Sequence, residues 1–600
     1  MKKYLLLPLI LFLPVLFFSC GDPKSAGDPE DTAFTAPASG TEQPYIVWQE
    51  APDGMLVDSI DCESLYLPCQ YNEGAYYDIP AKTDEAEKKI TFFLPCRVDR
   101  SRLTLAGVRD GKDDAYMTVD CSDGSDTPTV KINGVRYTLA VMQSDSPSLF
   151  FNIDETYGTI ADMRKSENKG KECFGDFIMT MTDPKAAVLG VKNTFVSVEN
   201  NAERAGTALF RGRGNASWET EKQTFLIGLE KKADLFGFGK GKKWVIVPCC
   251  KDPTMLRYQT ALLAAEAIGA VTPQYMPVDV FMNGAYTGSY LFFEKISVGE
   301  GRVEVNDLDD RNRVGDETPV MTSAEYRDPE AFSGKMQMTY YRGVTSPEDI
   351  TGGYLIEKDT RERATTSGNC WFRTTRGQYF TVHSPETASK EEMEYIAALF
   401  QQFEDSIYEK DGINRLTGKS YDDYMDMDSF ISRYFIDEIF RNTDALASSC
   451  YFFKPEDGRS TKLFAGPLWD YDNTIDWGGS LPEAEQWYLT NTEYLKKYDS
   501  GRATRFEYYQ KCFMIESFRE TAIAFFEETV YPAVSALLES GGVYDQTFEE
   551  NRDSVAMSET VTGPAAKGYD GKYDEYAGWL SKRLDYFSNT IWEYYDNYKG

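Results

Sequence analysis

Short apolar runs separated by turn residues recur along the first quarter of the chain and predict strands. The clearest are Lys89–Pro95, Tyr116–Val119 and Thr129–Leu139, and the last contains the Asn133-Gly134 pair that favours a tight hairpin. This spacing predicts a small β-sandwich domain over residues 44–145. Its sequence contains no evident catalytic cluster, so we expect it to be a spacer or adhesive module.

Farther along the chain, apolar residues recur at the spacing of helices. A long hairpin is expected around Asn283-Gly284. Helices are expected at Pro253–Ile268 (with Asp252 as N-cap and Gly269 as the stop), Glu391–Tyr408, Met427–Phe440 and Tyr573–Tyr598. A β-rich half followed by a helix-rich half predicts an α+β domain over residues 146–600, with two lobes and a cleft between them.

The N-terminus has the pattern of an export signal. Two lysines precede the apolar run Tyr4–Phe18, which ends at Ser19-Cys20-Gly21 and resembles the lipobox of bacterial lipoproteins. We therefore expect a signal peptide over residues 1–19, lipid modification of Cys20, and a flexible tether over residues 20–43. The alternative is an ordinary cleaved signal with a chance cysteine. The expected location is the cell envelope, with the protein anchored to a membrane and facing the periplasm or the cell exterior.

Charge and histidine content exclude several functional classes. The 96 acidic residues outnumber the 63 basic ones and give a formal charge of −33, which repels nucleic-acid backbones. His383 is the only histidine, so multi-histidine metal sites are excluded and any catalytic triad would need that residue. Any chemistry must therefore depend on carboxylates, lysine and arginine, with or without a hard metal ion.

Two carboxylates stand two residues apart in an apolar frame, Gly466-Pro-Leu-Trp-Asp470-Tyr-Asp472. In an extended segment such residues share a face, so Asp470 and Asp472 could bind one Mg²⁺ or Mn²⁺ ion together. The alternative is a chance pair in an acidic protein. Upstream, Asp444 follows a predicted helix and could be a cap or could accept a proton from a hydroxyl group.

Two further features favour neither a structural nor a binding role by themselves. The glycines between Arg211 and Asn215 could form a turn that approaches a ligand, although the Gly-x-Gly pattern is not specific. Lys222 opens a predicted strand and could be either a solvated strand end or a phosphate-binding charge.

Six motifs in fixed order resemble the CotH-type spore-coat kinase family, over roughly Pro147 to Tyr586. They are RGRGNASW with KQTFLIGL, WVIVPCCKDPTMLRYQTA, VFMNGAYTGSYLFFEKI, GGYLIEKD, SFISRYFIDEIFRNTDA and GPLWDYDNT. The resemblance implies an atypical two-lobed protein-kinase-like fold. It also implies transfer of the γ-phosphoryl group of ATP, with Mg²⁺ or Mn²⁺, to serine or threonine of secreted or surface proteins.

The resemblance also implies residue roles by motif position. Lys222 looks like the phosphate-binding lysine, Asp444 like the catalytic aspartate, and Asp470 like the main metal ligand with Asp472 as its helper. Glu294 looks like the hinge residue whose backbone meets adenine.

Three positions complete the comparison. Arg211 and Asn215 match the family signature, but the sequence assigns them no role beyond cofactor binding. Protein kinases place a metal-binding asparagine five residues after the catalytic aspartate, and this chain has Ser449 there. Ser449 and export favour a competing hypothesis, a surface-tethered binding or adhesion protein without phosphoryl transfer. A carboxylate-pair glycosidase is a third hypothesis, without support from motif order.

Overall fold

The computed structural model describes most of the chain from residue 46 onward. The described residues are 46–48, 55–61, 65–71, 75–96, 100, 102–108, 114–120, 128–132, 134–180, 189–190, 195–197, 202–204, 208–214, 216–326, 335–475, 481–498, 507–563 and 568–598. All of them belong to one compact unit, Gln43–Gly600. Cys20, the predicted signal peptide and the predicted tether lie outside the described residues, and so does Asn215.

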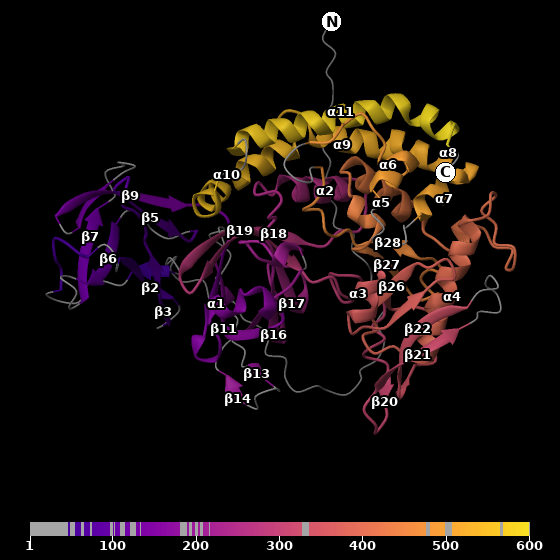
Figure 1. Ribbon diagram of the computed structural model, residues 1–600, viewed down its shortest axis with the longest axis horizontal. Coiled ribbons are helices and arrows are strands. Elements are labelled where there is room, and N and C mark those ends of the chain that lie inside the picture. The colour runs from indigo at the N-terminus through magenta and orange to yellow at the C-terminus, as the bar shows by residue number, and fades with distance from the viewer. Residues whose placement is uncertain are drawn as a thin grey trace, which may run out of the picture. The chain divides into compact units, whose positions relative to one another are not determined.

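Two small sheets form the first part of this unit (Figure 1). The first has the order β1-β2-β6-β7, with β3 paired to β2, and contains β1 (Ile46–Trp48), β2 (Tyr66–Tyr71), β3 (Ala75–Pro80), β6 (Arg102–Val108) and β7 (Asp114–Asp120). The second has the order β4-β5-β9-β8 and contains β4 (Lys82–Asp84), β5 (Lys89–Leu94), β8 (Thr129–Ile132) and β9 (Val135–Gln143). Buried side chains of both sheets form one hydrophobic cluster, and the predicted hairpin at 129–139 is present as β8 and β9.

A closed barrel of seven strands follows. Strand β10 (Ser148–Ile153) closes it, because β10 pairs in parallel with β18 (Tyr275–Met282) and antiparallel with β11 (Glu172–Thr180). The other strands, in order from β18 to β11, are β19 (Ala285–Glu294), β17 (Lys240–Val247), β16 (Phe225–Asp234) and β15 (Ala208–Gly212). The expected hairpin at Asn283-Gly284 is β18–β19, and both turn residues have positive φ, as this turn requires.

Alternate residues of the barrel strands point inward and form a buried core. This core includes Phe151, Phe210, Ile227, Trp244 and Phe292. The intervening residues of β17 and β19 point outward and join the largest core of the molecule, which the helices share. The barrel therefore presents its outer face to the rest of the chain.

Helix α2 (Leu256–Ala267) lies between β17 and β18 in sequence and packs in that largest core. It confirms the predicted helix and its stop at Gly269, whose φ is +76°. The predicted N-cap is wrong: Met255 occupies that position with a left-handed backbone. Asp252 instead accepts a hydrogen bond from the backbone N–H of Arg257 at 2.8 Å, so its carboxylate still satisfies a donor of the first turn.

Smaller elements surround the barrel. They are η3 (Glu155–Tyr157), α1 (Ile160–Met163), η4 (Ser166–Asn168), β12 (Leu189–Gly190), which extends the sheet at β11, the pair β13 (Phe195–Ser197) and β14 (Ala202–Arg204), and η5 (Ala216–Trp218).

A seven-stranded sheet, which the sequence patterns did not predict, occupies the second half. Its order is β21 (Val320–Tyr326), β22 (Met336–Arg342), β25 (Trp371–Arg373), β26 (Tyr379–Ser384), β24 (Tyr354–Asp359), β27 (Cys450–Lys454) and β28 (Phe464–Ala465). The short strands β20 (Arg313–Val314) and β23 (Val344–Thr345) pair separately. The expectation of a helix-rich second half is therefore only partly right, although the mixed α+β class is confirmed.

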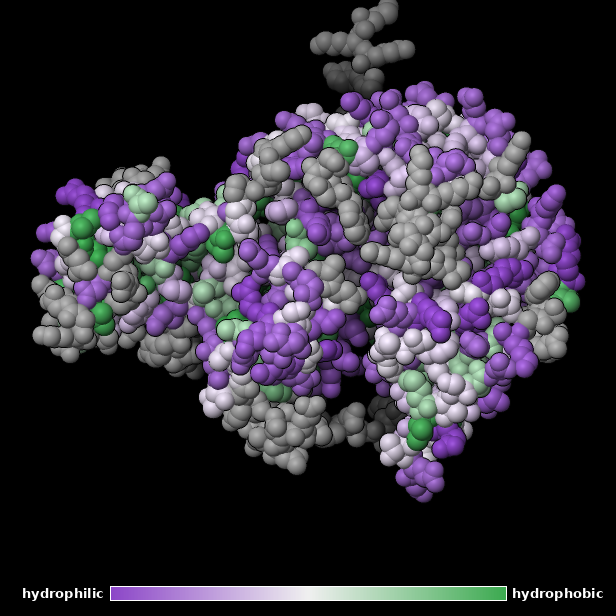
Figure 2. All heavy atoms as spheres, viewed as in Figure 1, coloured by the Kyte–Doolittle hydropathy of each residue, from purple (hydrophilic) through white to green (hydrophobic). Residues whose placement is uncertain are grey.

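Helices complete the fold. They are α3 (Arg361–Thr366), α4 (Lys390–Ile407), η6 (Tyr421–Asp423), α5 (Met427–Ile439), η7 (Thr443–Leu446), α6 (Thr492–Tyr498), α7 (Tyr508–Met514), α8 (Glu516–Phe525), the π-helical η8 (Phe526–Val530), α9 (Tyr531–Leu537), α10 (Val543–Thr562) and α11 (Gly568–Asp596). The predicted helices near 391–408, 427–440 and 573–598 are confirmed as α4, α5 and α11. In the described part of the chain, no helix combines the length and apolar character needed to span a membrane, and the visible surface is largely hydrophilic (Figure 2).

Candidate active site

Three aspartates that the sequence analysis singled out lie together. The carboxyl group of Asp472 hydrogen-bonds to that of Asp470, and both interact electrostatically with Asp444. Burial and then the charge of Asp470 raise the pKa of Asp444 to about 6. The same two causes raise the pKa of Asp472 to about 8. Asp444 belongs to η7, whereas the other two follow β28, so the fold brings separate segments to one acidic site.

The segment that carries Asp470 contacts helix α2 and barrel strand β19. Its N–H donates a hydrogen bond to the hydroxyl oxygen of Tyr258 on α2 at 3.0 Å. The neighbouring Trp469 ring packs edge-on to Phe293 of β19 at 5.1 Å. Our expectation of an extended segment is wrong, because Asp470 has φ +71° and the backbone turns there. The two carboxylates meet through this turn rather than through the alternation of a strand.

A chain of hydrogen bonds connects Asp470 to the seven-stranded sheet, which contains Glu357 in β24 and His383 in β26. Ser449 Oγ donates to Asp470 Oδ2 at 3.0 Å, and the Ser449 N–H donates to Glu357 Oε1 at 3.1 Å. Glu357 Oε2 lies 2.7 Å from Nε2 of His383. Burial opposes ionisation of Glu357, but the hydrogen bond and charge of His383 lower its pKa overall. Sequence reasoning missed this link, although it had singled out both the only histidine and the motif that contains Glu357.

Two arginines interact with the acidic site. Arg257 of α2 is fully buried and donates from Nη1 to the Thr474 carbonyl at 2.6 Å, and its charge opposes the rise in the pKa of Asp472. The charge of Arg363 on α3 likewise opposes the rise in the pKa of Asp444. Neither arginine was predicted, because each belongs to a helix distant in sequence from the aspartates that it affects.

Lys222 is buried beside the barrel. Its ammonium donates hydrogen bonds to the Ser289 carbonyl and, at 3.2 Å, to Ser558 Oγ on α10, and it lies 4.7 Å from the centre of the Tyr290 ring. Burial lowers the pKa of Lys222 to about 8. The structure therefore places Lys222 in contact with β19 and α10.

Glu294, the predicted hinge residue, ends β19. Its carboxylate lies 3.3 Å from Nε of Arg302, and its backbone N–H donates to the Gln274 carbonyl at 3.4 Å. Burial raises the pKa of Glu294 to about 7, and the charge of Arg302 opposes this shift.

The predicted Gly-x-Gly turn is present after β15. Gly214 has φ +86°, and a Cβ built there would lie 2.3 Å from Ser217 Oγ. A Cβ at Gly212 would lie 2.3 Å from the Trp218 ring, so both positions require glycine. Arg211 lies in β15, paired with Leu226 of β16.

The acidic site suits a hard cation that obtains its remaining ligands from elsewhere. Among the described residues, no group of three or more His, Cys, Asp and Glu side chains is arranged to hold a metal. The oxygen donors of Asp470 and Asp472 match the preference of Mg²⁺ and Mn²⁺, and the raised pKa of Asp472 means that the pair needs a proton or a cation between its charges. The two carboxylates therefore fit a divalent ion only if other groups supply its remaining ligands.

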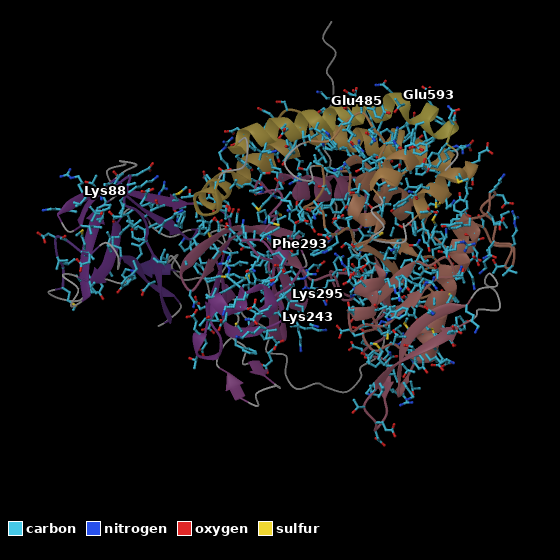
Figure 3. The ribbon with its side chains drawn as sticks, in the orientation of Figure 1. Lys88, Lys243, Phe293, Lys295, Glu485 and Glu593 are labelled. Carbon is cyan, nitrogen blue, oxygen red and sulfur yellow. The ribbon has the colours of Figure 1, made fainter. Side chains whose placement is uncertain are left out.

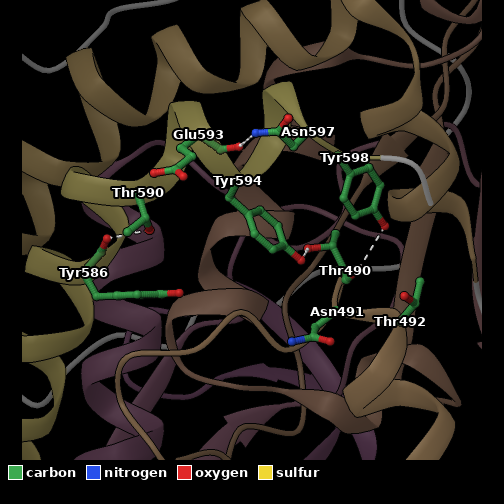
Figure 4. Close-up of a pocket in the computed structure, with 9 residues that line it drawn as sticks. All are labelled: Thr490, Asn491, Thr492, Tyr586, Thr590, Glu593, Tyr594, Asn597 and Tyr598. Carbon is green, nitrogen blue, oxygen red and sulfur yellow. Dashed lines mark hydrogen bonds between the residues drawn. The ribbon is translucent and has the colours of Figure 1, made fainter.

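A separate pocket of about 600 Å³ lies between α11 and the segment that leads into α6 (Figure 4). It is lined by Thr490, Asn491, Thr492, Tyr586, Thr590, Glu593, Tyr594, Asn597 and Tyr598. None of the predicted site residues lines it, so we do not assign the active site to this pocket.

Comparison with protein families agrees with the motif order. A family model described as CotH kinase protein matches residues 210–586, more than half of the chain. The matched segment contains Lys222, Glu294, Asp444, Asp470 and Asp472. No curated protein matches the chain at a significant level.

Proposed function

This chain belongs to the CotH kinase family, and on that basis we propose that it is an exported, metal-dependent protein kinase. It transfers the γ-phosphoryl group of ATP to serine or threonine of surface or secreted proteins. The observation that carries this proposal is the convergence of Asp444, Asp470 and Asp472 from two segments.

The order of elements supports a two-lobed kinase-like arrangement. Protein kinases have a glycine-rich loop, a lysine-bearing strand and a helix, followed by a catalytic aspartate and then a metal-binding aspartate. Here the Gly212–Gly214 turn, strands β16 and β17, and helix α2 precede Asp444 and Asp470 in the same order. Lys222, however, lies three residues before β16 and does not open the strand, as the sequence had predicted it would.

The residues of the chain divide the chemistry between them. Asp444, with a pKa of about 6, is mostly ionised at neutral pH and can accept the proton of an acceptor hydroxyl group. Asp470 and Asp472 would hold Mg²⁺ or Mn²⁺, and Ser449 and Tyr258 fix the position of Asp470. Bound MgATP would supply the phosphoryl group and neutralising charge. The positive charge of Arg363 opposes the rise in the pKa of Asp444 and so favours its ionised, proton-accepting form.

A second candidate function is a surface-tethered binding protein that retains the fold without phosphoryl transfer. The observation that favours it is that the ammonium of Lys222, the expected phosphate-binding group, already donates hydrogen bonds to Ser289 and Ser558. Ser449, at the position of the second metal ligand in protein kinases, is consistent with it.

The predicted export signal supports the location that we propose for this protein. We infer that Cys20 is acylated and that the tether after it holds the catalytic part at a membrane surface, facing the periplasm or the exterior. Substrates would then be other proteins of the same compartment.

Incubation of the full chain with labelled ATP and Mn²⁺ or Mg²⁺ tests the proposal. Label should appear on the protein itself or on surface proteins. Asp444→Asn should leave ATP affinity nearly unchanged and reduce transfer by roughly 10²–10⁴-fold, whereas Asp470→Asn should weaken metal-dependent binding. Asp574→Asn on the exposed side of α11 is the matched control. Metal-dependent ATP binding without any transfer would favour the binding protein.

A further inference from the structure

Four basic side chains share the outer face of the barrel. They belong to β15, β17 and β19 or directly follow these strands, and β16 lies between β15 and β17. Arg211 of β15 pairs with Leu226, Leu226 pairs with Val245, and Val245 pairs with Phe293 of β19. Because alternate residues of a strand point to the same side, the residues two positions away share this face. They include Arg213, Lys243 and Lys295.

The strand ends hold these residues in register. The Arg213 N–H donates to the Thr224 carbonyl at 3.1 Å, and the Lys295 N–H donates to the Lys243 carbonyl at 3.2 Å. Lys243 and Lys295 accordingly lie close together beside Phe293 (Figure 3). The pairing of the barrel thus extends one residue beyond β15 and β19 and keeps all four cations on one face.

Only one of these four cations has an acidic partner within the described residues. Within the described residues, Arg211, Arg213 and Lys295 form no ion pair. Lys243 approaches Glu386 at 3.6 Å, and the charge of Glu386 also acts on Lys295. Burial, and then the positive charges of Lys243, Arg213 and Arg211, lower the pKa of Lys295 to about 8. In a chain with a charge of −33, four cations that share a single carboxylate partner indicate an anion site.

The cationic face is next to the acidic site. The Arg213 guanidinium lies 5.6 Å from the centre of the Trp469 ring, and Trp469 directly precedes Asp470. Phe293, two residues before Lys295, packs against the same tryptophan. An anion on this face would therefore lie beside the carboxylates that fit a divalent cation.

Lys222 does not belong to this group. Its ammonium contacts the carbonyl of Ser289, six residues before Lys295 on the same strand, or roughly 20 Å along an extended chain. Its hydrogen bonds go to Ser289 and Ser558, whereas Arg211, Arg213 and Lys295 form no ion pair within the described residues.

We propose that Arg211, Arg213, Lys243 and Lys295 form a polyphosphate-binding site, with Arg213 and Lys295 at its centre. It takes the phosphate chain of a nucleotide or inorganic triphosphate, because successive phosphates carry several charges that can meet separate cations and a metal ion at once. This inference rests on the proposed function for the identity of the nucleotide, but not for the anion chemistry. It gives a role to Arg211 and Arg213, the two arginines of the RGRGNASW motif.

Calorimetric titration of the full chain with inorganic triphosphate, ATP and adenosine, each with and without Mg²⁺, tests this site. Wild type should bind triphosphate and ATP. Lys295→Gln and Arg213→Gln should each weaken triphosphate binding by about tenfold or more and leave adenosine binding unchanged, since each loses hydrogen bonds to a charged group. Lys295→Arg should retain binding. Lys410→Gln, which changes an exposed lysine elsewhere, is the matched control, and Lys243→Gln provides a variant at a more exposed position if Arg213→Gln or Lys295→Gln fails to fold.

The outcomes separate the inference from the proposed function. Triphosphate affinity within twofold of wild type in all the Gln variants overturns the polyphosphate site, and so does a wild type that binds no triphosphate. Loss of triphosphate binding in the variants supports the site even if no phosphoryl transfer is found, in which case only the proposed function fails. If ATP binding depends on Lys222 (tested as Lys222→Met) and not on Arg213 or Lys295, the site is wrong and the proposed function stands.

Discussion

The hydroxyl group of Ser449 donates a hydrogen bond to Oδ2 of Asp470 across 3.0 Å, although 21 residues separate the two in sequence. Both residues have left-handed backbones, with φ +60° and +71°. Ser449 occupies the position at which protein kinases place a metal-binding asparagine. In this protein its hydroxyl group orients the Asp470 carboxylate, and its N–H donates a hydrogen bond to Glu357.

The first prediction concerns this bond. Ser449→Ala should weaken Mg²⁺-dependent ATP binding by about tenfold, because a hydrogen bond to a charged group is lost. Ser449→Asn should preserve binding, because asparagine tolerates the left-handed backbone and its amide can reach Asp470. Titration calorimetry measures both, with Ser588→Ala, an exposed serine of α11, as control. Equal affinities in wild type and Ser449→Ala would contradict the orienting role.

Metal binding should release a proton from Asp472. Its pKa of about 8 means that this carboxyl group is largely protonated at neutral pH without metal. Metal affinity should therefore increase as the pH rises toward 8 and level off above it. Titration with Mn²⁺ in buffers of different ionisation enthalpy measures the protons released. Asp472→Asn should remove the pH dependence along with part of the affinity, and a wild-type affinity that does not change between pH 6 and pH 8.5 would refute this assignment.

Glu294 should make the fold less stable as the pH rises. Its folded-state pKa of about 7 is above the ordinary value of 4.5, so the folded protein binds more protons between these values than the unfolded chain. Its stabilising contribution is complete below about pH 4.5 and is lost as the pH rises through about 7. Glu294→Gln should flatten the dependence of melting temperature on pH in this window. Glu485→Gln, an exposed control, should follow wild type, and parallel curves for all three proteins would exclude this role.

Removal of residues 44–145 should destabilise the remaining chain. Phe150, Phe281 and Tyr286 of the barrel share one hydrophobic cluster with the two small sheets, and the buried Asp279 accepts a hydrogen bond from Ser144. A chain starting at Ser146 would expose this surface and lose the Ser144 hydroxyl. We expect the free energy of unfolding to fall by a few kcal/mol and the melting temperature to fall by several degrees. Scanning calorimetry of both chains checks this, and equal melting temperatures would show that the sheets form an independent module.

The lipid anchor is testable in cells. Cys20→Ser should move the protein from the membrane fraction to the soluble fraction, because a serine hydroxyl group cannot form the thioether of a lipoprotein. Cell fractionation with immunodetection measures the distribution, and Ser25→Ala in the tether is the control. If Cys20→Ser remains in the membrane fraction, lipid modification of Cys20 is not what holds the protein at the membrane.

Local patterns in the sequence determined individual elements and the acidic motif. Helices α4 and α5 follow from apolar spacing, and the β18–β19 hairpin follows from Asn283-Gly284. The order of six motifs was enough to identify the family. Asp470 and Asp472 could be selected because carboxylates in an apolar frame are costly to bury without a partner or a metal, and Asp444 because it follows a predicted helix upstream of this pair. These features depend on interactions between near neighbours, which periodicity and turn residues report directly.

Only the tertiary structure decided which of these elements meet. The seven-stranded sheet pairs β24 with β27, nearly one hundred residues later, and no local pattern specifies that partner. The sequence left Lys222 as either a solvated strand end or a phosphate-binding charge, whereas in the fold its buried ammonium donates a hydrogen bond to Ser558, 336 residues away. The cationic face needs the register of four strands at once, because each strand by itself only alternates between two sides. The periodicity of a strand determines which residues share a face, whereas packing between distant segments determines what that face meets.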